Sequence, residues 1–346
     1  MDATKDGAVA AVINFNTAQL TARSVRALVD AGIAHVLVLD NGSAPADFER
    51  LRAALEGAGP GVRVIRSDAN LGFAAGSNRL VAEALADARC SRVLLVNSDA
   101  VVDARGLEAC LGQMRAGGFD LMGGRMLKPP AAGAAPVVDS LGVTLYKSLL
   151  ASNRMSTEDA YLGPTGGFAI YTRAFLEEVV RLHGEVFDAT YFCYAEDTDL
   201  CVRARLLGRA VGYTDAVVAY HEGQASNAGR YDDFILYHGI RNSIWMAAKS
   251  IPMSILLRQL PWVVLLHGGI VLRHTLQGRV RTVFRLYRDA LAGLPVVWAR
   301  RGAVQATRRV TPHAFRAHLD RHFYETRFLR DAIRDLFRRP GPPPTG

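Results

Sequence analysis

The sequence predicts an α/β protein in which a mostly parallel sheet with flanking helices is followed by a basic, mainly helical region. Through the first hundred residues, short apolar runs alternate with helical stretches, a pattern typical of buried parallel strands covered by helices on both faces. The excess of basic residues lies at the other end of the chain. We therefore expect a first domain over residues 1–230, with two halves that meet near residue 120, and a second region over residues 231–346.

The expected strands of the first half are apolar runs without a helical period, at residues 8–14, 35–39, 62–66 and 92–96. Helical stretches separate them at residues 21–31, 47–56 and 74–88. In the second half, strands are expected at residues 137–146, 167–171 and 216–220, and helices at 173–183 and 198–208. A parallel sheet of this kind binds its ligands beyond the carboxyl ends of the strands.

The composition is that of a globular protein, with 346 residues of which 50% are hydrophobic and 21% charged. The four cysteines show no C-x-x-C spacing, which argues against a zinc site or a disulfide framework and favours a reducing compartment. The N-terminus carries Asp2 and Asp6 and lacks a basic segment before a long apolar run, so no secretory signal peptide is predicted.

Basic character is confined to the last quarter of the chain. Residues 251–346 contain 17 Arg, no Lys and 5 acidic residues, a formal charge of +12, whereas residues 1–250 contain 24 basic and 28 acidic residues, a charge of −4. The mostly apolar run at 260–272 is shorter than the roughly 20 residues that a spanning helix needs. The next segment separates apolar residues from Arg281, Arg285 and Arg288 on a helical projection.

Such a basic amphipathic helix beside an apolar one predicts contact with an anionic membrane surface. The alternatives are a helical subdomain that packs on the core, or a dimer contact. We expect a cytoplasmic protein that is peripherally associated with the inner face of the cytoplasmic membrane.

Polar residues follow each of the four expected strands of the first half. They are Asn14 and Asn16, then Asp40, then the segment from Asn70 through Gly72 and Gly76 to Asn78, then Asn97 and Asp99. One such group is ordinary turn chemistry, but four groups at one sheet edge predict a ligand site.

The residue types at this edge suit a nucleotide diphosphate and a divalent cation. Asp99 follows a buried strand and can hold a cation that also binds a diphosphate, and His221 at the end of another strand can complete the metal site. Asp40 can accept a hydrogen bond from a base or a ribose. Gly72 and Gly76 allow close backbone approach at the start of a helix, which favours an anion. Walker-type and dinucleotide-binding glycine motifs are absent from the sequence.

A second group of acids, Glu196, Asp197 and Asp199, follows an aromatic run. Acids at a helix start complement the helix dipole, and this explanation needs no chemistry. The other interpretation makes Asp197 a general base for an acceptor hydroxyl. The residues alone leave both interpretations open, and the turn that contains Thr165 and Gly166 is likewise either an acceptor-binding loop or a plain turn.

Taken in order, these motifs resemble those of glycosyltransferase family 2, the inverting enzymes of the GT-A fold, and most closely its bacterial rhamnosyltransferase-like branch, which builds cell-surface polysaccharides. The resemblance covers about residues 8–260. The motifs that carry it are Ile13-Asn14-Phe15-Asn16, Val38-Leu39-Asp40-Asn41-Gly42-Ser43, Asn70-Leu71-Gly72-Phe73-Ala74-Ala75-Gly76-Ser77-Asn78, Leu95-Val96-Asn97-Ser98-Asp99, Glu196-Asp197-Thr198-Asp199-Leu200, His221 and Arg241-Asn242.

The resemblance implies a donor-binding half at about 1–120 and an acceptor and catalytic half at about 121–230. It implies that Asp40 reads the base, that Asp99 and His221 bind Mg²⁺ or Mn²⁺, and that Asp197 is the catalytic base. The remaining donor-site residues are expected to be Asn14, Asn16, Asn70, Gly72, Gly76, Asn78 and Asn97. The expected acceptor-site residues are Thr165, Gly166, Glu196 and Asp199. Many members have an acid where this chain has Asn97, which lowers the negative charge of the metal site.

The reaction that the resemblance implies is inverting transfer of a sugar, with L-rhamnose from dTDP-rhamnose as the first choice, to a hydroxyl of a saccharide that is polyprenyl-linked. A UDP-sugar donor is the alternative. A sugar nucleotidyltransferase would need a glycine-rich basic loop after the first strand, where Asn14, Asn16 and Thr17 stand instead. A non-catalytic adaptor is the third hypothesis. Aromatic residues do not alternate with the arginines as in nucleic-acid modules, so no nucleic-acid partner is expected. The oligomeric state is not specified by the sequence.

Overall fold

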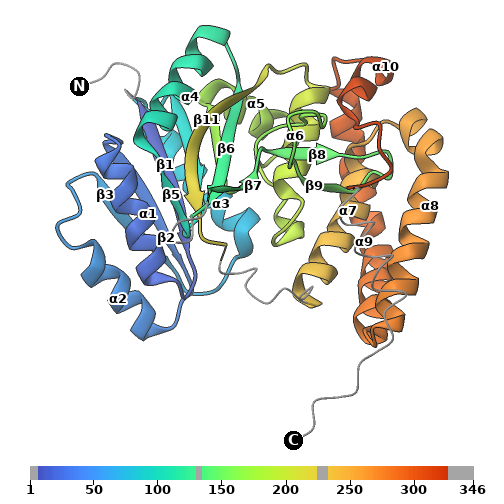
Figure 1. Cartoon of the computed structure of the whole chain (residues 1–346), viewed down its shortest axis with the longest axis horizontal. Helices are drawn as coiled ribbons and strands as arrows, with labels where there is room; N and C mark the ends of the chain where they lie inside the picture. The colour runs from blue at the N-terminus through green and yellow to red at the C-terminus, as the bar shows by residue number, and fades with distance from the viewer. Residues whose placement is uncertain (1–6, 130–134, 224–232, 326–346) are drawn as a thin grey trace, which may run out of the picture.

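A computed structural model describes residues 7–129, 135–223 and 233–325 of the chain. A large sheet with its covering helices forms one side of the molecule, and a group of long C-terminal helices packs beside it (Figure 1). The tail arginines beyond residue 325 lie outside the described residues.

The large sheet has nine strands among the described residues, in the order β3-β2-β1-β4-β10-β6-β11-β5 with β7 paired to β6. Its strands are β1 Ala8–Asn14, β2 His35–Asn41, β3 Val62–Ser67, β4 Arg92–Val96, β5 Ala100–Val102, β6 Leu121–Lys128, β7 Val137–Ser140, β10 Phe168–Thr172 and β11 Val211–His221. A small second sheet pairs β8 Val143–Leu145 with β9 Ala151–Asn153. Strands β1 to β4 are parallel, as the alternation of apolar runs and helices predicts, whereas β10 runs antiparallel between β4 and β6.

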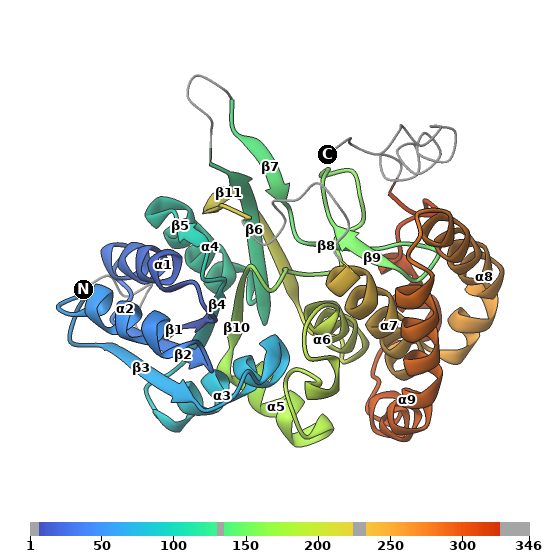
Figure 2. The same cartoon turned by 90° about the horizontal axis from the view of Figure 1, so that it is seen from below.

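Helices cover both faces of the sheet (Figure 2). They are α1 Ala18–Asp30, α2 Pro45–Leu55, α3 Gly72–Ala86, α4 Ala104–Gly117, α5 Arg173–His183, the short η1 Ala189–Tyr191 and α6 Glu196–Leu206. Successive residues of β1 alternate between two cores: Ala8, Ala10 and Val12 pack with α1, α2 and α4, and Val9 and Ala11 pack with α3, α5 and α6. Because β1, β2 and β4 are buried on both faces, they appear in the sequence as apolar runs.

The sequence-based boundaries hold to within three residues for the seven elements that were predicted in the first half, whereas β5 and α4 were not predicted. The expected strand at 137–146 is wrong: it is two strands, β7 and β8, separated at Leu141 and Gly142. Gly142 has a φ of 107°, and a Cβ there would lie 2.4 Å from Tyr161, so this position requires glycine. The break lets β7 pair with β6 while β8 pairs with β9 in the second sheet.

The C-terminal region consists of α7 Asp233–Ser250, α8 Met253–Leu276, α9 Val280–Ala306, α10 Pro312–Phe315 and η3 Arg316–His318. It is packed firmly on the first domain. One buried cluster joins Leu145 of β8 and Val202 of α6 to Met246 of α7 and Val297 of α9. Packing on the core, which was an alternative to membrane contact, is therefore what α7 and α9 do.

The expectation that the apolar run 260–272 is too short to cross a membrane is wrong for the helix that contains it. Helix α8 continues through Pro261 and has 24 residues. It is the one helix in the described part of the chain that is long and apolar enough to span, by length and composition alone.

Candidate active site

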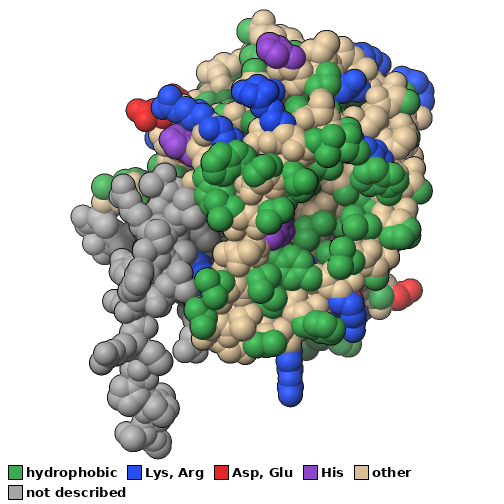
Figure 3. Space-filling view, turned by 90° about the vertical axis from the view of Figure 1, so that its right-hand side faces the viewer, with side chains coloured by type: hydrophobic (Ala, Val, Ile, Leu, Met, Phe, Trp, Pro, Cys, Tyr) green, Lys and Arg blue, Asp and Glu red, His purple; other side chains and the backbone are tan. Residues whose placement is uncertain are grey.

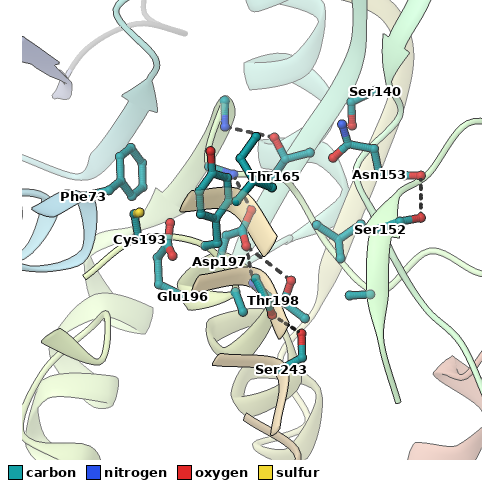
Figure 4. A pocket seen from close by; sticks show the side chains of 18 of the residues that line it. Phe73, Ser140, Ser152, Asn153, Thr165, Cys193, Glu196, Asp197, Thr198 and Ser243 are labelled. Carbon is teal, nitrogen blue, oxygen red and sulfur yellow. Dashed lines mark hydrogen bonds between the residues drawn. The ribbon is translucent and has the colours of Figure 1, made fainter. Parts of the chain in front are cut away.

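A cavity of about 490 Å³ lies between the sheet edge, the start of α6 and the C-terminal helices. Figure 4 shows Glu196 and Asp197 on one side of it, with Phe73 and Thr165 beside them and Ser152 and Asn153 of β9 across from them. Four kinds of element line it, namely the strand ends at Asn97 and His221, the β7 to β9 segment, the turn at Thr165–Gly167, and α7 through Ile235, Gly239, Ile240 and Ser243.

The side chains of Asn14, Asp40 and Arg66 lie in a row at the other end of the sheet edge. Strand register places Asn14 beside Asp40 and Asp40 beside Arg66. Asp40 is fully buried; its Oδ1 accepts a hydrogen bond from Asn14 Nδ2 at 2.9 Å, and its Oδ2 lies 3.5 Å from Arg66 Nε without a hydrogen-bond donor in the structure. Asp40 is as fully buried as Asn14 and does not line the cavity, so its contact with a base or a ribose stays a prediction.

Asn14 supports Asp40 through hydrogen bonds within the protein and does not face a ligand. It is fully buried, and its Nδ2 also contacts Ser43 Oγ and Asp47 Oδ2 while its Oδ1 accepts from Thr21 Oγ1. Its expected donor contact is therefore corrected to a supporting role for Asp40. Asn16 is exposed and holds the start of α2, since its Oδ1 accepts from Ala44 N at 3.0 Å.

The segment from Asn70 to Asn78 also differs from the expectation. The first amides of α3 are already bonded within the protein: Leu71 N to Asn41 Oδ1, Gly72 N to Asn70 Oδ1, and Ala74 N to the Phe192 carbonyl. Helix N-termini bind anions through such amides, so these three are not available to a diphosphate in the observed arrangement.

The two glycines of this segment are explained by packing against protein. A Cβ on Gly72 would lie 2.5 Å from Phe192, and one on Gly76 would lie 3.1 Å from Ile13 and 3.2 Å from Leu39. Asn78 points away from the sheet edge, with its Nδ2 donating to the Phe187 carbonyl and its Oδ1 accepting from Phe187 N. The donor roles expected for Gly72, Gly76 and Asn78 are thus corrected to structural ones.

Asp99 and His221 meet as expected, because β5 pairs with β11 and places His221 opposite Ala100. His221 Nε2 lies 3.0 Å from Asp99 Oδ1, and its Nδ1 lies 2.8 Å from Asp139 Oδ2. Burial alone would lower the pKa of His221, but the hydrogen bonds and charges of Asp139 and Asp99 outweigh it and raise the pKa to about 10. Asp139 is on β7 and was not predicted.

These residues fit a divalent cation. A carboxylate oxygen and an imidazole nitrogen are ligands for Mn²⁺ or Mg²⁺, and metal-binding histidines commonly donate their other ring N–H to a carboxylate. Asp99 and Nε2 of His221 would hold the ion, and Asp139 would orient the imidazole through Nδ1. Asn97, which lines the same cavity, offers an uncharged oxygen.

The described residues contain one group of three closely spaced ligand atoms, and it lies elsewhere, at Asp159, Asp320 and His322. Both oxygens of Asp320 already accept backbone hydrogen bonds, from Ala160 N and from His322 N. This group is explained by the turn that it holds together.

Asp197 lies in the first turn of α6 and lines the cavity. Its Oδ2 accepts from Gly166 N at 2.8 Å and its Oδ1 from Thr198 N at 2.6 Å. Burial raises the pKa of Asp197 above its ordinary value, while these hydrogen bonds oppose the rise. A carboxylate that is held in place and has a raised pKa is suited to accept a proton from a hydroxyl.

Glu196 lines the same cavity but differs from Asp197 in environment. It is 6% exposed, and its Oε2 has no hydrogen-bond partner in the structure. Burial, together with the neighbouring charge of Asp197, raises the pKa of Glu196 well above its ordinary value. Glu196 is therefore better suited to donate a hydrogen bond as a neutral acid than to take a proton. Thr165 and Gly166 line the cavity as expected.

Asp199 is not at the cavity, and its expected acceptor contact is corrected. It is fully buried on the other side of α6, within hydrogen-bond distance of Lys249 Nζ at 2.9 Å, Arg203 Nε at 2.8 Å and Ser250 Oγ at 2.6 Å. Burial alone would raise the pKa of Asp199, but the charges of Lys249 and Arg203 outweigh it and the pKa is lowered.

We expect Asp199→Ala to destabilise the protein by about 3–5 kcal/mol, because it leaves Lys249 and Arg203 buried with one fewer counter-charge. Thermal unfolding checks this. At a temperature where the variant is folded, its KM for acceptor should stay within about twofold of the wild-type value, because the substitution removes no contact with the acceptor. A lost contact worth about 1.4 kcal/mol would change KM about tenfold. A normal melting temperature together with a large rise in the KM for acceptor would support the original assignment of Asp199 to the acceptor site.

The sheet order, with acidic residues at the carboxyl ends of the parallel strands and at the start of α6, is that of the GT-A fold. Residues 10–180 match the family model described as Glycosyl transferase family 2.

Among solved structures, the chain is similar to the crystal structure of GalNAc-T7 with UDP, GalNAc and Mn²⁺. The identity is 11% and the TM-score 0.51; the match covers 72% of this chain, and this chain spans 49% of that one. The match shows the fold and extends it beyond residue 180. A search of curated proteins gave no match.

Proposed function

We propose that this protein is a metal-dependent, inverting glycosyltransferase that uses a nucleotide-diphosphate sugar. The observation that carries the proposal is the cavity that has His221, bonded to Asp99, at one wall and the carboxylate of Asp197 at another. The family match over residues 10–180 supports it, as do the UDP and Mn²⁺ that accompany GalNAc-T7 in the similar structure.

The proposed division of labour follows from the contacts. Asp40 receives a donor group of the nucleotide through its open Oδ2, and Asn14 and Arg66 hold it in place. Asp99 and His221 would hold a cation, which would supply positive charge beside the diphosphate. Asp197, held by the amides of Gly166 and Thr198, removes the proton of the acceptor hydroxyl as that oxygen attacks the anomeric carbon. One displacement inverts the anomeric configuration, and no protein nucleophile is needed.

The donor proposed first is dTDP-rhamnose, on the sequence resemblance, and a UDP-sugar is the second candidate, supported by the UDP of the similar structure. The test is to incubate the protein and Mn²⁺ with each donor and a saccharide acceptor, and to follow the nucleoside diphosphate released and the anomeric configuration of the product. Inverted product supports the proposal. Retained configuration would overturn the inverting mechanism, and release of pyrophosphate from a nucleoside triphosphate would favour a nucleotidyltransferase instead.

The outer face of α8 and α9 supports a membrane location. Figure 3 shows this face of the molecule covered by hydrophobic side chains, with basic side chains near its margins. Its exposed large apolar residues are Met253, Leu257, Leu260, Trp262, Val264, Leu265, Val271, Leu272, Leu276, Val280, Phe284, Leu291, Val296 and Trp298. We call these residues the α8–α9 face. A continuous apolar patch of this extent marks a membrane or protein contact.

The charge of this region favours an anionic bilayer as the partner. Exposed arginines of α8 and α9 include Arg258, Arg281, Arg285 and Arg288, and Asp289 is the one acid in the two helices. Exposed Trp262 and Trp298 suit the headgroup level.

The α8–α9 face suits lying in the membrane surface rather than spanning the bilayer. The opposite side of α8 packs on the protein through Ile255, Leu266 and Ile270, and α9 is anchored to the first domain through Arg300 and Asp188. We propose that the protein is cytoplasmic and lies on the inner face of the cytoplasmic membrane through this face.

A polyprenyl-linked saccharide is the proposed acceptor, because the cavity lies next to the inner side of α8, whose outer side carries the α8–α9 face. Leu150, Ile240 and Tyr324 line the cavity, and the same buried cluster contains Leu266 and Ile270 of α8. A saccharide presented at the membrane surface would thus be close to the cavity.

Reversing two charges at the α8–α9 face should weaken binding to anionic vesicles. Each basic residue near an anionic surface contributes about 1 kcal/mol to the free energy of membrane binding. Arg258→Glu together with Arg281→Glu should therefore weaken binding by about 2 kcal/mol, which lowers the vesicle partition coefficient roughly thirtyfold. Co-sedimentation with vesicles of phosphatidylglycerol and phosphatidylethanolamine measures this.

The matched control is Arg52→Glu with Arg105→Glu, on α2 and α4 at the other side of the molecule (Figure 1), which should not change binding. Equal loss in both double variants would mean that binding reflects net charge alone. Absence of wild-type binding would contradict the membrane location and leave the transferase activity untouched.

A further inference from the structure

The chain that leads into α6 has an unusual backbone between Tyr191 and Glu196. Three non-glycine residues there have positive φ angles: Phe192 at 66°, Tyr194 at 67° and Ala195 at 69°. Phe192 has a ψ of −65°, and Cys193 N donates to the Tyr191 carbonyl at 2.8 Å, so residues 191–193 form a γ-turn of the rare, strained type. We call residues 191–195 the strained turn. Such a backbone persists where its surroundings over-determine it.

Asn242, at the middle of α7, holds the strained turn. It is fully buried, and its Nδ2 donates to the carbonyls of Tyr191 at 2.9 Å, Cys193 at 2.7 Å and Tyr194 at 2.8 Å. The two N–H groups of the amide are therefore shared among three carbonyls.

The orientation of the Asn242 amide is itself fixed. Arg241 Nε donates to Asn242 Oδ1 at 3.0 Å, and Arg241 Nη2 donates to the Tyr191 carbonyl at 3.2 Å. The carbonyl of Phe192, which Asn242 does not reach, accepts from Ala74 N of α3. All four carbonyls from Tyr191 to Tyr194 are thus held by donors from α7 or α3.

The strained turn determines where the carboxylate of Asp197 lies. Asp197 is the second residue after the turn, and its Oδ2 accepts a hydrogen bond from Gly166 N. Cys193, Tyr194 and Ala195 line the cavity next to it. A shift of the turn would therefore move Asp197 relative to the Thr165–Gly167 loop, and a 1 Å misplacement of a reacting group costs about a hundredfold in rate.

We propose that Asn242, oriented by Arg241, is a positioning residue that holds the strained turn and so places the carboxylate of Asp197 for catalysis. This rests on the proposed role of Asp197 as base. Asn242 does not line the cavity, so it acts through the turn. On this proposal the C-terminal helices complete the active site, although they lie outside the segment that matches the family model.

The test is Asn242→Ala in the full-length protein, with steady-state kinetics and hydrogen exchange of the backbone amides of residues 192–198. We expect kcat to fall by about 10- to 100-fold, the KM for donor to stay within about twofold, and exchange to accelerate in the strained turn more than in the sheet. Asn242→Ser, which keeps one donor group, should fall between wild type and Asn242→Ala; it takes the place of the alanine variant if that variant does not fold.

The matched control is Gln305→Ala. It removes another side-chain amide that donates to a backbone carbonyl of α7, that of Ser250 at 2.9 Å, without contact to the strained turn. Its kcat should be unchanged. Two results would overturn the inference: unchanged kcat and exchange in a folded Asn242 variant, or equal loss of kcat in the Gln305 control, which would reduce Asn242 to a general stabilising role.

These outcomes are separable from a failure of the proposed function. If Asp197→Asn were fully active, Asp197 would not be the base, and the exchange data would still report whether Asn242 holds the turn. If Asp197→Asn were inactive and Asn242→Ala normal, the base would stand and the positioning role would fall.

Discussion

Asp197→Asn should lower kcat by about 10²- to 10⁴-fold, the range that general base catalysis contributes, while affinity for the nucleoside diphosphate is retained. The substitution keeps the size and planarity of the side chain and removes its capacity to take a proton. Transfer assays give kcat, and calorimetric titration with the nucleoside diphosphate gives the affinity. Normal turnover would exclude Asp197 as the base.

The matched comparison is Glu196→Gln, which should lower kcat less than tenfold, since burial raises the pKa of Glu196 and favours its neutral form. A larger loss in Glu196→Gln than in Asp197→Asn would exchange the two roles.

The pH profile provides a second check on the base. Burial raises the pKa of Asp197, and a base acts in its ionised form. Wild-type kcat/KM should therefore fall as the pH decreases through a value above the ordinary range of an aspartate, and this acid limb should be absent from the residual activity of Asp197→Asn. An acid limb that persists unchanged in the variant would belong to another group.

Asp99→Ala should abolish the part of nucleotide affinity that depends on metal. Because Asp99 and His221 provide the two ligand groups, we expect at least a tenfold loss of affinity for the nucleoside diphosphate in the presence of Mn²⁺ and little change with chelator. Calorimetric titration with UDP, dTDP and GDP measures this and also identifies the base. Asp139→Asn, which leaves both ligands but weakens the orientation of His221, should lie between wild type and Asp99→Ala.

Binding of the cation should also release a proton. The pKa of His221 is about 10, because its hydrogen bonds to Asp139 and Asp99 outweigh the effect of burial, so the imidazole is protonated at neutral pH without metal. A metal ligand must be neutral, and affinity for Mn²⁺ should therefore rise with pH up to about 10. Titrations in buffers of different ionisation enthalpy count the protons.

Equal loss of affinity with and without chelator in Asp99→Ala would contradict a metal role.

The strands that were predicted correctly are those that pack against apolar side chains on both faces of the sheet. Strands β1 to β4 each contain a short apolar run and were located from the sequence. Strand β6 was missed, because Gly123, Gly124 and Arg125 interrupt its apolar character. Those glycines are required by neighbours that are remote in sequence: a Cβ on Gly123 would meet Pro164, and one on Gly124 would meet Val218.

The prediction of the site was limited in the same way, by contacts between residues that are remote in sequence. Asp40, Asp99, His221 and Asp197 could be located, since each stands at the end of a strand or the start of a helix. Spacing alone could not tell that Asp199, two residues after Asp197, lies on the opposite side of α6 against Lys249. Nor could it reveal Asp139, an acid on a short strand after a Pro-, Ala- and Gly-rich loop, whose role depends on the pairing of β7 with β6.

The contacts that α7 makes with α6 and the turn before it bear on how the chain folds. Lys249 adds a second counter-charge to that of Arg203 at the buried carboxylate of Asp199, and Ser250 donates a hydrogen bond to it. Asn242 donates to the carbonyls of the strained turn. We therefore expect the helices after residue 230 to unfold together with the sheet, although the sequence changes character at that point. On this expectation, the carboxylate of Asp197 reaches its position when both parts are folded.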